Sequence, residues 1–129
     1  NNNTIMKIEV KRVYQVEDPS DGYRVLVDKL WPRGIKKADL HYDLWAKQIV
    51  PSDALRKFFH EDIVGHWDIF KDKYIEELRN SDDFNEFVEQ LKMKKPAVLT
   101  LLYASKEPIH NHALILKDEI NRALNKEQL

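Results

Sequence analysis

An apolar run near the carboxyl end of the sequence limits most strongly what this chain can fold into. Residues Ala97 to Ala104 are almost continuously apolar, and only Thr100 and Tyr103 carry hydroxyl groups. Such a run without alternation is typical of a strand covered on both faces, as in a parallel sheet with helices on each side. The sequence therefore predicts that Ala97 to Ala104 form a fully buried central strand.

Four helical patterns accompany this strand, one after it and three before it. Pro108 suits the first position of the last helix, because its missing N–H group is not needed there. From Ile109 onward, apolar residues recur at helical spacing. The three earlier helices are expected to start at Ser52, Asp62 and Ser81, of which the serines suit the N-cap position.

The amino-terminal part of the chain predicts two more strands. Ile5 to Tyr14 has the pattern of an edge strand, and Tyr23 to Leu30 is rich in Val and Leu. The turn-rich segment between them is too short for a helical crossover, so we expect a hairpin. Residues 36–42 favour a short helix, and residues 44–50 favour a short strand or an extended segment. We expect the strands beginning at Ala97 and Tyr23 to be central neighbours.

These elements together predict one α/β domain over residues 5–126. We expect a single three-layer domain with a small, mostly parallel sheet flanked by helices, because the strands alternate with helical patterns. A chain of 129 residues is long enough to bury a core without disulfides or metals. Residues 1–4 are expected to be a disordered N-terminal extension.

The composition narrows the class of partner. The chain has 21 basic and 22 acidic residues and a net charge of −1, which disfavours nucleic acid and anionic membranes as partners. It contains no cysteine, so a disulfide scaffold, a thiol nucleophile and a cysteine zinc site are excluded. No apolar run approaches the roughly 18 residues of a membrane span, and residues 1–20 lack the apolar region of a signal peptide. We therefore expect a cytoplasmic location.

Three blocks of sequence carry a family resemblance. They are RVLVDKLWPRG (24–34), DLWAKQIVPSDALRKFFH (43–60) and LLYASKEPIHNHALIL (101–116). With these blocks the chain resembles the YeaO-like family, small bacterial proteins grouped as a domain of unknown function, from Lys7 to Leu124. The resemblance implies a compact cytoplasmic α/β domain without an established activity.

The chain departs from the pattern of the family at two places. Lys29 stands where the family commonly has Arg, so a bidentate role is not carried over to it. More distant relatives have a Cys, and a Cys-His-Arg cluster, around the last strand and helix. Here Tyr103 and the run His110-Asn111-His112 occupy that region, and no thiol chemistry is implied.

The turn after the second strand holds the first candidate site residues. Arg33 lies in a turn fixed by Pro32 and Gly34 and offers a planar donor fork to a phosphate or carboxylate. Asp28 lies on an apolar strand and needs a cation, so we expect it to contact and orient Arg33. An internal ion pair without a ligand is the alternative, and both can hold. Trp31, beside Arg33 in this turn, walls a pocket, stacks on a base or belongs to the core.

The segment between the last strand and helix holds the other candidates. Ser105, Lys106 and Asn111 precede or open the helix and can bind an oxyanion, or be a solvated loop and a cap. His110 is the candidate for acid–base catalysis, with a structural histidine as the alternative. Residues two apart on a helix point in different directions, so His110 and His112 are not expected to share a metal ion.

Both groups of candidates follow strands that we expect to be parallel neighbours. The carboxyl ends of such strands are where ligands bind in open α/β sheets, so Arg33, Lys106 and His110 are expected to line one pocket. The sequence thus predicts binding of a small anionic ligand, phosphorylated or nucleotide-like, without a cofactor or metal. Whether turnover follows is left open. A non-enzymatic protein-interaction module and a nucleic-acid-binding protein are the alternatives.

Overall fold

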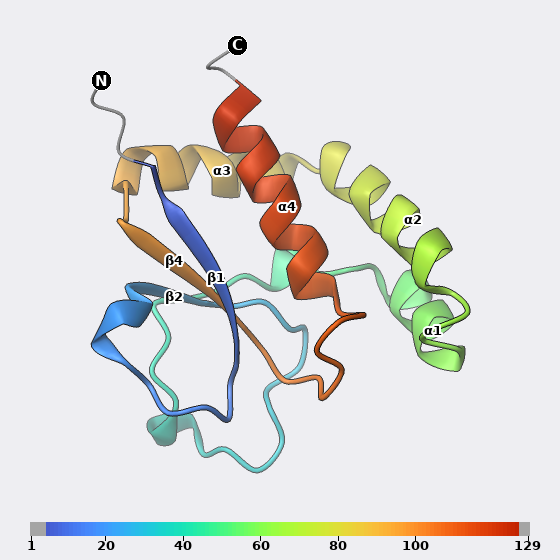
Figure 1. Ribbon diagram of the computed structural model, residues 1–129, viewed down its shortest axis with the longest axis horizontal. Helices are drawn as coiled ribbons and strands as arrows, with labels where there is room; N and C mark the ends of the chain where they lie inside the picture. Colours follow the sequence, from blue (N-terminus) through green and yellow to red (C-terminus); the bar gives the residue numbers. More distant parts are fainter. Residues whose placement is uncertain (1–4, 127–129) are drawn as a thin grey trace.

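The computed structural model describes residues 5–126, so the predicted disordered extension of residues 1–4 lies outside the described residues. A four-stranded sheet has the order β1-β4-β2-β3 and is parallel throughout. Its strands are β1 (Lys7–Arg12), β2 (Tyr23–Leu26), β3 (Leu44–Trp45) and β4 (Val98–Tyr103). The helices are α1 (Asp53–Glu61), α2 (Trp67–Arg79), α3 (Asp82–Lys94) and α4 (His112–Asn125). This architecture confirms the predicted α/β fold (Figure 1).

The apolar run near the carboxyl end forms the central strand, as predicted, but the strand is shorter than the run, since Ala97 is exposed and Ala104 is half-buried. β4 pairs in parallel with β1 on one side and with β2 on the other. All of its residues from Leu99 to Tyr103 are buried, and only Val98 at its start is half-buried. The strand beginning at Tyr23 is also its direct neighbour, so the carboxyl ends of β2 and β4 meet at one edge of the sheet.

The predicted hairpin between the first two strands is wrong, because β4 lies between them. The connection contains a 3-10 helix, Pro19–Asp21, that packs closely on β4. The hydroxyl of Thr100 donates to the carbonyl of Asp21 at 2.6 Å. Gly22 has a φ of 66°, and a Cβ there would lie 2.5 Å from the carbonyl oxygen of Val98. This close packing lets the chain pass from β1 across β4 to β2 without an α-helix.

The α-helices all contribute to one core cluster on one face of the sheet. Val25, Leu99 and Leu101 from this face pack with Tyr74 of α2 and Leu116 of α4. Leu26 and Leu102 point to the other face, where loop residues such as Trp31 and Ile35 cover them. The cover on this face is therefore made of loop residues, Leu40 among them, rather than of the predicted α-helices.

Two of the predicted helix starts are confirmed. The hydroxyl of Ser52 accepts from the amide of Leu55, and that of Ser81 accepts from the amide of Phe84. The second helix begins at Trp67 rather than at Asp62, because the preceding residues form turns. None of the helices in residues 5–126 has the length and apolar character that a membrane crossing requires.

The last helix begins at His112 and not at Pro108. Asn111 is its N-cap, and its side-chain oxygen accepts from the amide of Leu114 at 3.3 Å. The carboxylate of Glu107 accepts from the amides of Ile109 and His110, which keeps residues 107–110 in a separate turn. Because α4 starts later, a different histidine occupies its first turn.

Candidate functional site

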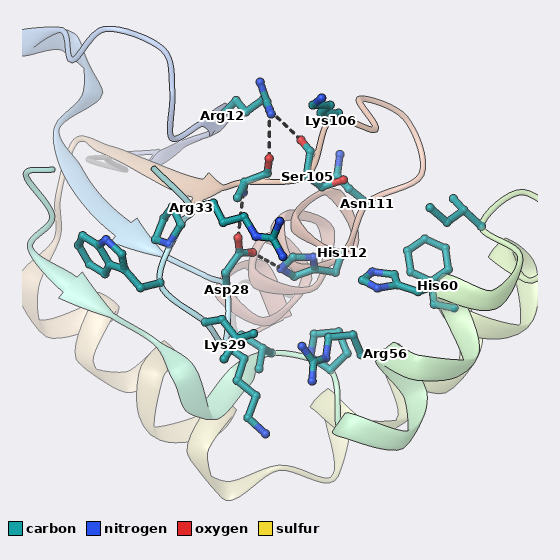
Figure 2. Close-up of a pocket in the computed structure, with 18 of the residues that line it drawn as sticks. Arg12, Asp28, Lys29, Arg33, Arg56, His60, Ser105, Lys106, Asn111 and His112 are labelled. Atoms are coloured by element: carbon teal, nitrogen blue, oxygen red, sulfur yellow. Dashed lines mark hydrogen bonds and ion pairs between the residues drawn. The ribbon is translucent and has the colours of Figure 1, made fainter. Parts of the chain in front are cut away.

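A cavity of about 640 Å³ lies at the carboxyl ends of β2 and β4. The loops that follow these strands border it together with α1, and the start of α4 lies between them (Figure 2). Its polar lining residues are Arg12, Tyr14, Asp28, Lys29, Arg33, Arg56, His60, Ser105, Lys106, Asn111 and His112. Its apolar lining residues are Leu30, Trp31, Pro32, Val50, Pro51, Phe59, Ile63, Phe70 and Ala104.

Most of the residues that the sequence singled out do meet at this cavity. Those that line it are Trp31, Arg33, Asp28, Ser105, Lys106 and Asn111. They come from two loops far apart in sequence, which β2 and β4 bring together as parallel neighbours. His110 does not line the cavity, so the prediction that it shares one pocket with Arg33 and Lys106 is wrong.

Asp28 does not contact Arg33, contrary to the prediction. One of its carboxylate oxygens accepts from the amide of Ala104 at 2.9 Å, and the other lies 3.2 Å from Nε2 of His112. The carboxylate thus joins the end of β2 to the end of β4 and the start of α4. These partners satisfy the half-buried Asp28, so its predicted role in orienting Arg33 is also wrong.

His112 takes the place that the sequence assigned to His110. Its Nε2 lies 2.6 Å from the carbonyl oxygen of Val27, which can only accept, so Nε2 carries the hydrogen. In the neutral ring Nδ1 is then an acceptor. Nδ1 has no hydrogen-bond partner within residues 5–126, and it is not buried. His112 therefore presents a free nitrogen in a ring that Asp28 and the Val27 carbonyl hold in place.

The missed signal for His112 was the residue before it. Asparagine is among the preferred N-cap residues, so Asn111 marked His112 as the first residue of the helix. His110 lies outside the helix, and its ring packs edge-on against Trp67 with 5.2 Å between ring centroids. Its Nδ1 is buried and lies 3.5 Å from a carboxylate oxygen of Glu107. His110 therefore has the environment of a structural histidine rather than of a catalytic one.

Three basic side chains at the cavity have no carboxylate partner within the described part of the chain: Arg12, Arg33 and Lys106. The Nε of Arg12 donates to the carbonyls of Ala104 and Ser105, which holds this side chain over the end of β4. The turn that carries Arg33 is fixed by a hydrogen bond of 2.8 Å from the hydroxyl of Tyr14 to the Arg33 carbonyl. Positive charge at this side of the cavity is therefore not neutralised internally.

The basic residues on the other side share one carboxylate. Lys29 and Arg56 both form ion pairs with Asp53 at the start of α1. His60, one turn further along α1, lies at the cavity too. Partial desolvation of its ring, and then the positive charges of Arg56 and His112, lower the pKa of His60 below its ordinary value. At neutral pH the imidazole of His60 is therefore uncharged and does not add to the positive charge.

Two further predicted residues are held by bonds within the protein. The side chain of Asn111 caps α4 and donates to the carbonyl of Glu107 at 2.9 Å. The indole of Trp31 donates to the carbonyl of Ile35 and packs edge-on against Trp45. Both therefore shape the cavity wall. Among residues 5–126 there is no group of three or more His, Cys, Asp or Glu side chains that could hold a metal ion.

The fold and the cavity define a small α/β domain with a basic cavity at the carboxyl ends of its parallel strands. Residues 7–129 match the model of a family described as the inactive DUF488-N3 subclade, and the chain belongs to this family.

Curated relatives agree with this assignment. The chain is 48% identical over 113 residues to the uncharacterized protein YeaO of Escherichia coli (strain K12), covering 88% of this chain and 96% of that protein. It is 36% identical over 115 residues to the uncharacterized protein Rv3073c of Mycobacterium tuberculosis (strain ATCC 25618 / H37Rv), covering 89% and 94%. No solved structure matches the chain. The resemblance to the YeaO-like family is thereby confirmed.

Proposed function

We propose that this protein binds a small anionic ligand, such as a phosphorylated or nucleotide-like molecule, in the cavity at the ends of β2 and β4. The observation that carries the proposal is that Arg12, Arg33 and Lys106 border one cavity without a carboxylate partner in residues 5–126. Like charges brought together in this way repel one another, and a bound anion removes that repulsion. The hydroxyl of Ser105 is a further donor beside them.

The charge in the cavity supports an anion rather than a cation. Asp28 is the carboxylate that lines it within the described chain, and both of its oxygens already have partners. Arg33 is exposed, so it is free to turn its donor fork toward a phosphate or carboxylate. Each charge-assisted hydrogen bond to such a group contributes about 1.5–3 kcal/mol where water is partly excluded.

The proposal is that the protein binds this ligand without converting it. The description of the family calls the subclade inactive, which favours a protein that recognises a ligand and does not transform it. A cytoplasmic location, where phosphorylated metabolites are abundant, fits this proposal.

A second candidate function, acid–base catalysis, rests on the free Nδ1 of His112. Its Nε2 is fixed by Val27 and Asp28, so Nδ1 can take up or deliver a proton next to a bound anion. The test is release of 4-nitrophenol from 4-nitrophenyl phosphate at equal concentrations of protein and substrate. Release that His112→Gln abolishes supports catalysis at this ring, and absence of release from the wild type rules out this reaction.

Ligand-dependent thermal unfolding tests the binding proposal. A ligand that binds only the folded protein stabilises it by about 2.7 kcal/mol at one hundred times its dissociation constant. We expect phosphate and phosphorylated metabolites to raise the unfolding temperature of the wild type. Arg33→Ala and Lys106→Ala should lose most of this increase, because each removes a cation that faces the cavity.

Lys57→Ala is the matched control for charge. Lys57 is an exposed residue of α1 that does not line the cavity, so its loss changes the net charge equally. This variant should keep the full ligand-dependent increase. An equal increase in wild type and in a variant with both Arg33→Ala and Lys106→Ala would show that anions stabilise the protein elsewhere.

A further inference from the structure

The cavity is larger than an isolated anion requires. Its volume of about 640 Å³ lies within the range of roughly 300–1,000 Å³ that is typical of sites for whole organic ligands. The residues that can hold an anion account for one part of this space. The remaining wall offers a surface to a second part of the ligand, and its chemistry indicates what that part is.

The basic residues divide into two groups on opposite sides of the cavity (Figure 2). Arg12 and Lys106 lie on one side, and the Arg33 side chain extends from the loop after β2 into the space between the two groups. Lys29 and Arg56 lie on the other side, where Asp53 partly neutralises both. The first group is thus the stronger anion site.

The α1 side of the cavity carries apolar side chains as well as the basic residues Arg56 and His60, and part of this apolar surface is already packed. The ring of Phe59 stacks on that of Phe70 with 4.0 Å between centroids and an angle of 12°. Ile63 and Val50 are only half-buried, so part of their surface faces the cavity. Leu30, which is 66% exposed, adds apolar surface from the loop after β2. Such a preformed apolar wall binds a flat, apolar group without first having to rearrange.

We infer that the ligand has one anionic end, the head, and a ring-shaped apolar part, the body. The anionic group binds at Arg12, Arg33 and Lys106, and the body lies against Ile63 and Val50. His112 lies between the two sides (Figure 2), where its free Nδ1 meets the junction of head and body. This inference rests on the proposed function and narrows it to aromatic or heteroaromatic monophosphates and carboxylates.

Three probes separate the head from the body. Inorganic phosphate supplies the head alone, ribose 5-phosphate supplies the same head with a polar body, and phenyl phosphate supplies it with an apolar ring. We expect phenyl phosphate to bind at least about tenfold more tightly than ribose 5-phosphate in calorimetric titration, because burial of one ring face on apolar surface gains roughly that factor. Arg33→Ala should weaken all three probes.

Variants of the apolar wall should affect only the preference for the ring. Leu30→Ala, whose exposed side chain contributes little to stability, and Ile63→Ala should each reduce the ratio of the phenyl phosphate affinity to the ribose 5-phosphate affinity by about threefold or more. Ile69→Ala, an exposed position on α2 outside the cavity, is the control and should leave the ratio unchanged. Thermal unfolding of each variant shows that it is folded.

The outcomes distinguish this inference from the proposed function. Equal affinity for phenyl phosphate and ribose 5-phosphate, with binding that still depends on Arg33, overturns the apolar body and leaves the anion site in place. A preference for the ring that neither Leu30→Ala nor Ile63→Ala reduces also overturns it. Binding of none of the probes in a manner that depends on Arg33 overturns the anion site and the inference together.

Discussion

Asp28 should be the most important polar side chain of the cavity for stability. Asp28→Ala removes the acceptor of the Ala104 amide, which lies 2.9 Å away, and the contact with Nε2 of His112 at 3.2 Å. A hydrogen bond to a charged group is worth about 1.5–3 kcal/mol. The contact with His112 is partly exposed to water and adds less than about 1 kcal/mol.

We therefore expect Asp28→Ala to lower the free energy of unfolding by about 2–3 kcal/mol. For a chain of this length that corresponds to a fall of roughly 6–15 °C in the midpoint of thermal unfolding. Asp28→Asn keeps an oxygen that can accept from the Ala104 amide, so its cost should be about half as large. Urea unfolding measures both variants, and an unchanged slope shows that the same two states are compared.

The control for the lost charge is Asp72→Ala, at an exposed position of α2. This change should stay within about 0.5 kcal/mol of the wild type. A cost for Asp28→Ala as small as that of Asp72→Ala would refute the role given to Asp28. A strong coupling energy between Asp28→Ala and Arg33→Ala in a double-mutant cycle would also refute it, because the two side chains are not partners in the structure.

Three further predictions concern the fold around β4 and the pH dependence of stability. Gly22→Ala should cost about 1–3 kcal/mol or more in urea unfolding, since φ is 66° and the new Cβ would lie 2.5 Å from a β4 carbonyl oxygen. Burial raises the pKa of Asp21, but hydrogen bonds, above all the one from Lys11, lower that pKa below 3.8 overall. The contribution of Asp21 to stability should therefore be present above pH 3.8 and be lost as the pH falls through the folded-state pKa. The hydrogen bond to Glu17 raises the pKa of His41 above 6.5. The contribution of His41 to stability should therefore be present below pH 6.5 and be lost as the pH rises through the folded-state pKa. His41→Gln should abolish this pH dependence between about pH 6 and 8.

Local patterns were sufficient to predict several parts of the fold. The unbroken apolar run of β4 indicated a central strand, because water would meet apolar side chains on either face. Ser52 and Ser81 marked two helix starts, since a serine hydroxyl can satisfy a free amide in the first turn. Placing the ends of β2 and β4 together also predicted which two loops meet at the cavity.

Other features depend on contacts between residues far apart in sequence. The turn chemistry before Tyr23 is compatible with a hairpin, and only the insertion of β4 between the strands excludes it. Asp28 pairs with residues more than seventy positions later, so Arg33, the nearest basic residue after the following turn, was the wrong partner. The choice of His110 over His112 failed through a shift of the helix start, because Pro108 suits a helix start as well as Asn111 does.

The claim that an anion binds beside Arg33 and Lys106 is tested most directly by nuclear magnetic resonance. Phenyl phosphate is titrated into ¹⁵N-labelled protein, and the backbone amide shifts show where it binds. We predict saturable shifts at Arg33, Ser105, Lys106 and His112, and in Arg33→Ala the shifts at Ser105, Lys106 and His112 should require a much higher concentration of phenyl phosphate. Shifts that gather at the exposed lysines Lys36 and Lys37, away from the cavity, or that persist unchanged in Arg33→Ala would contradict the proposed site.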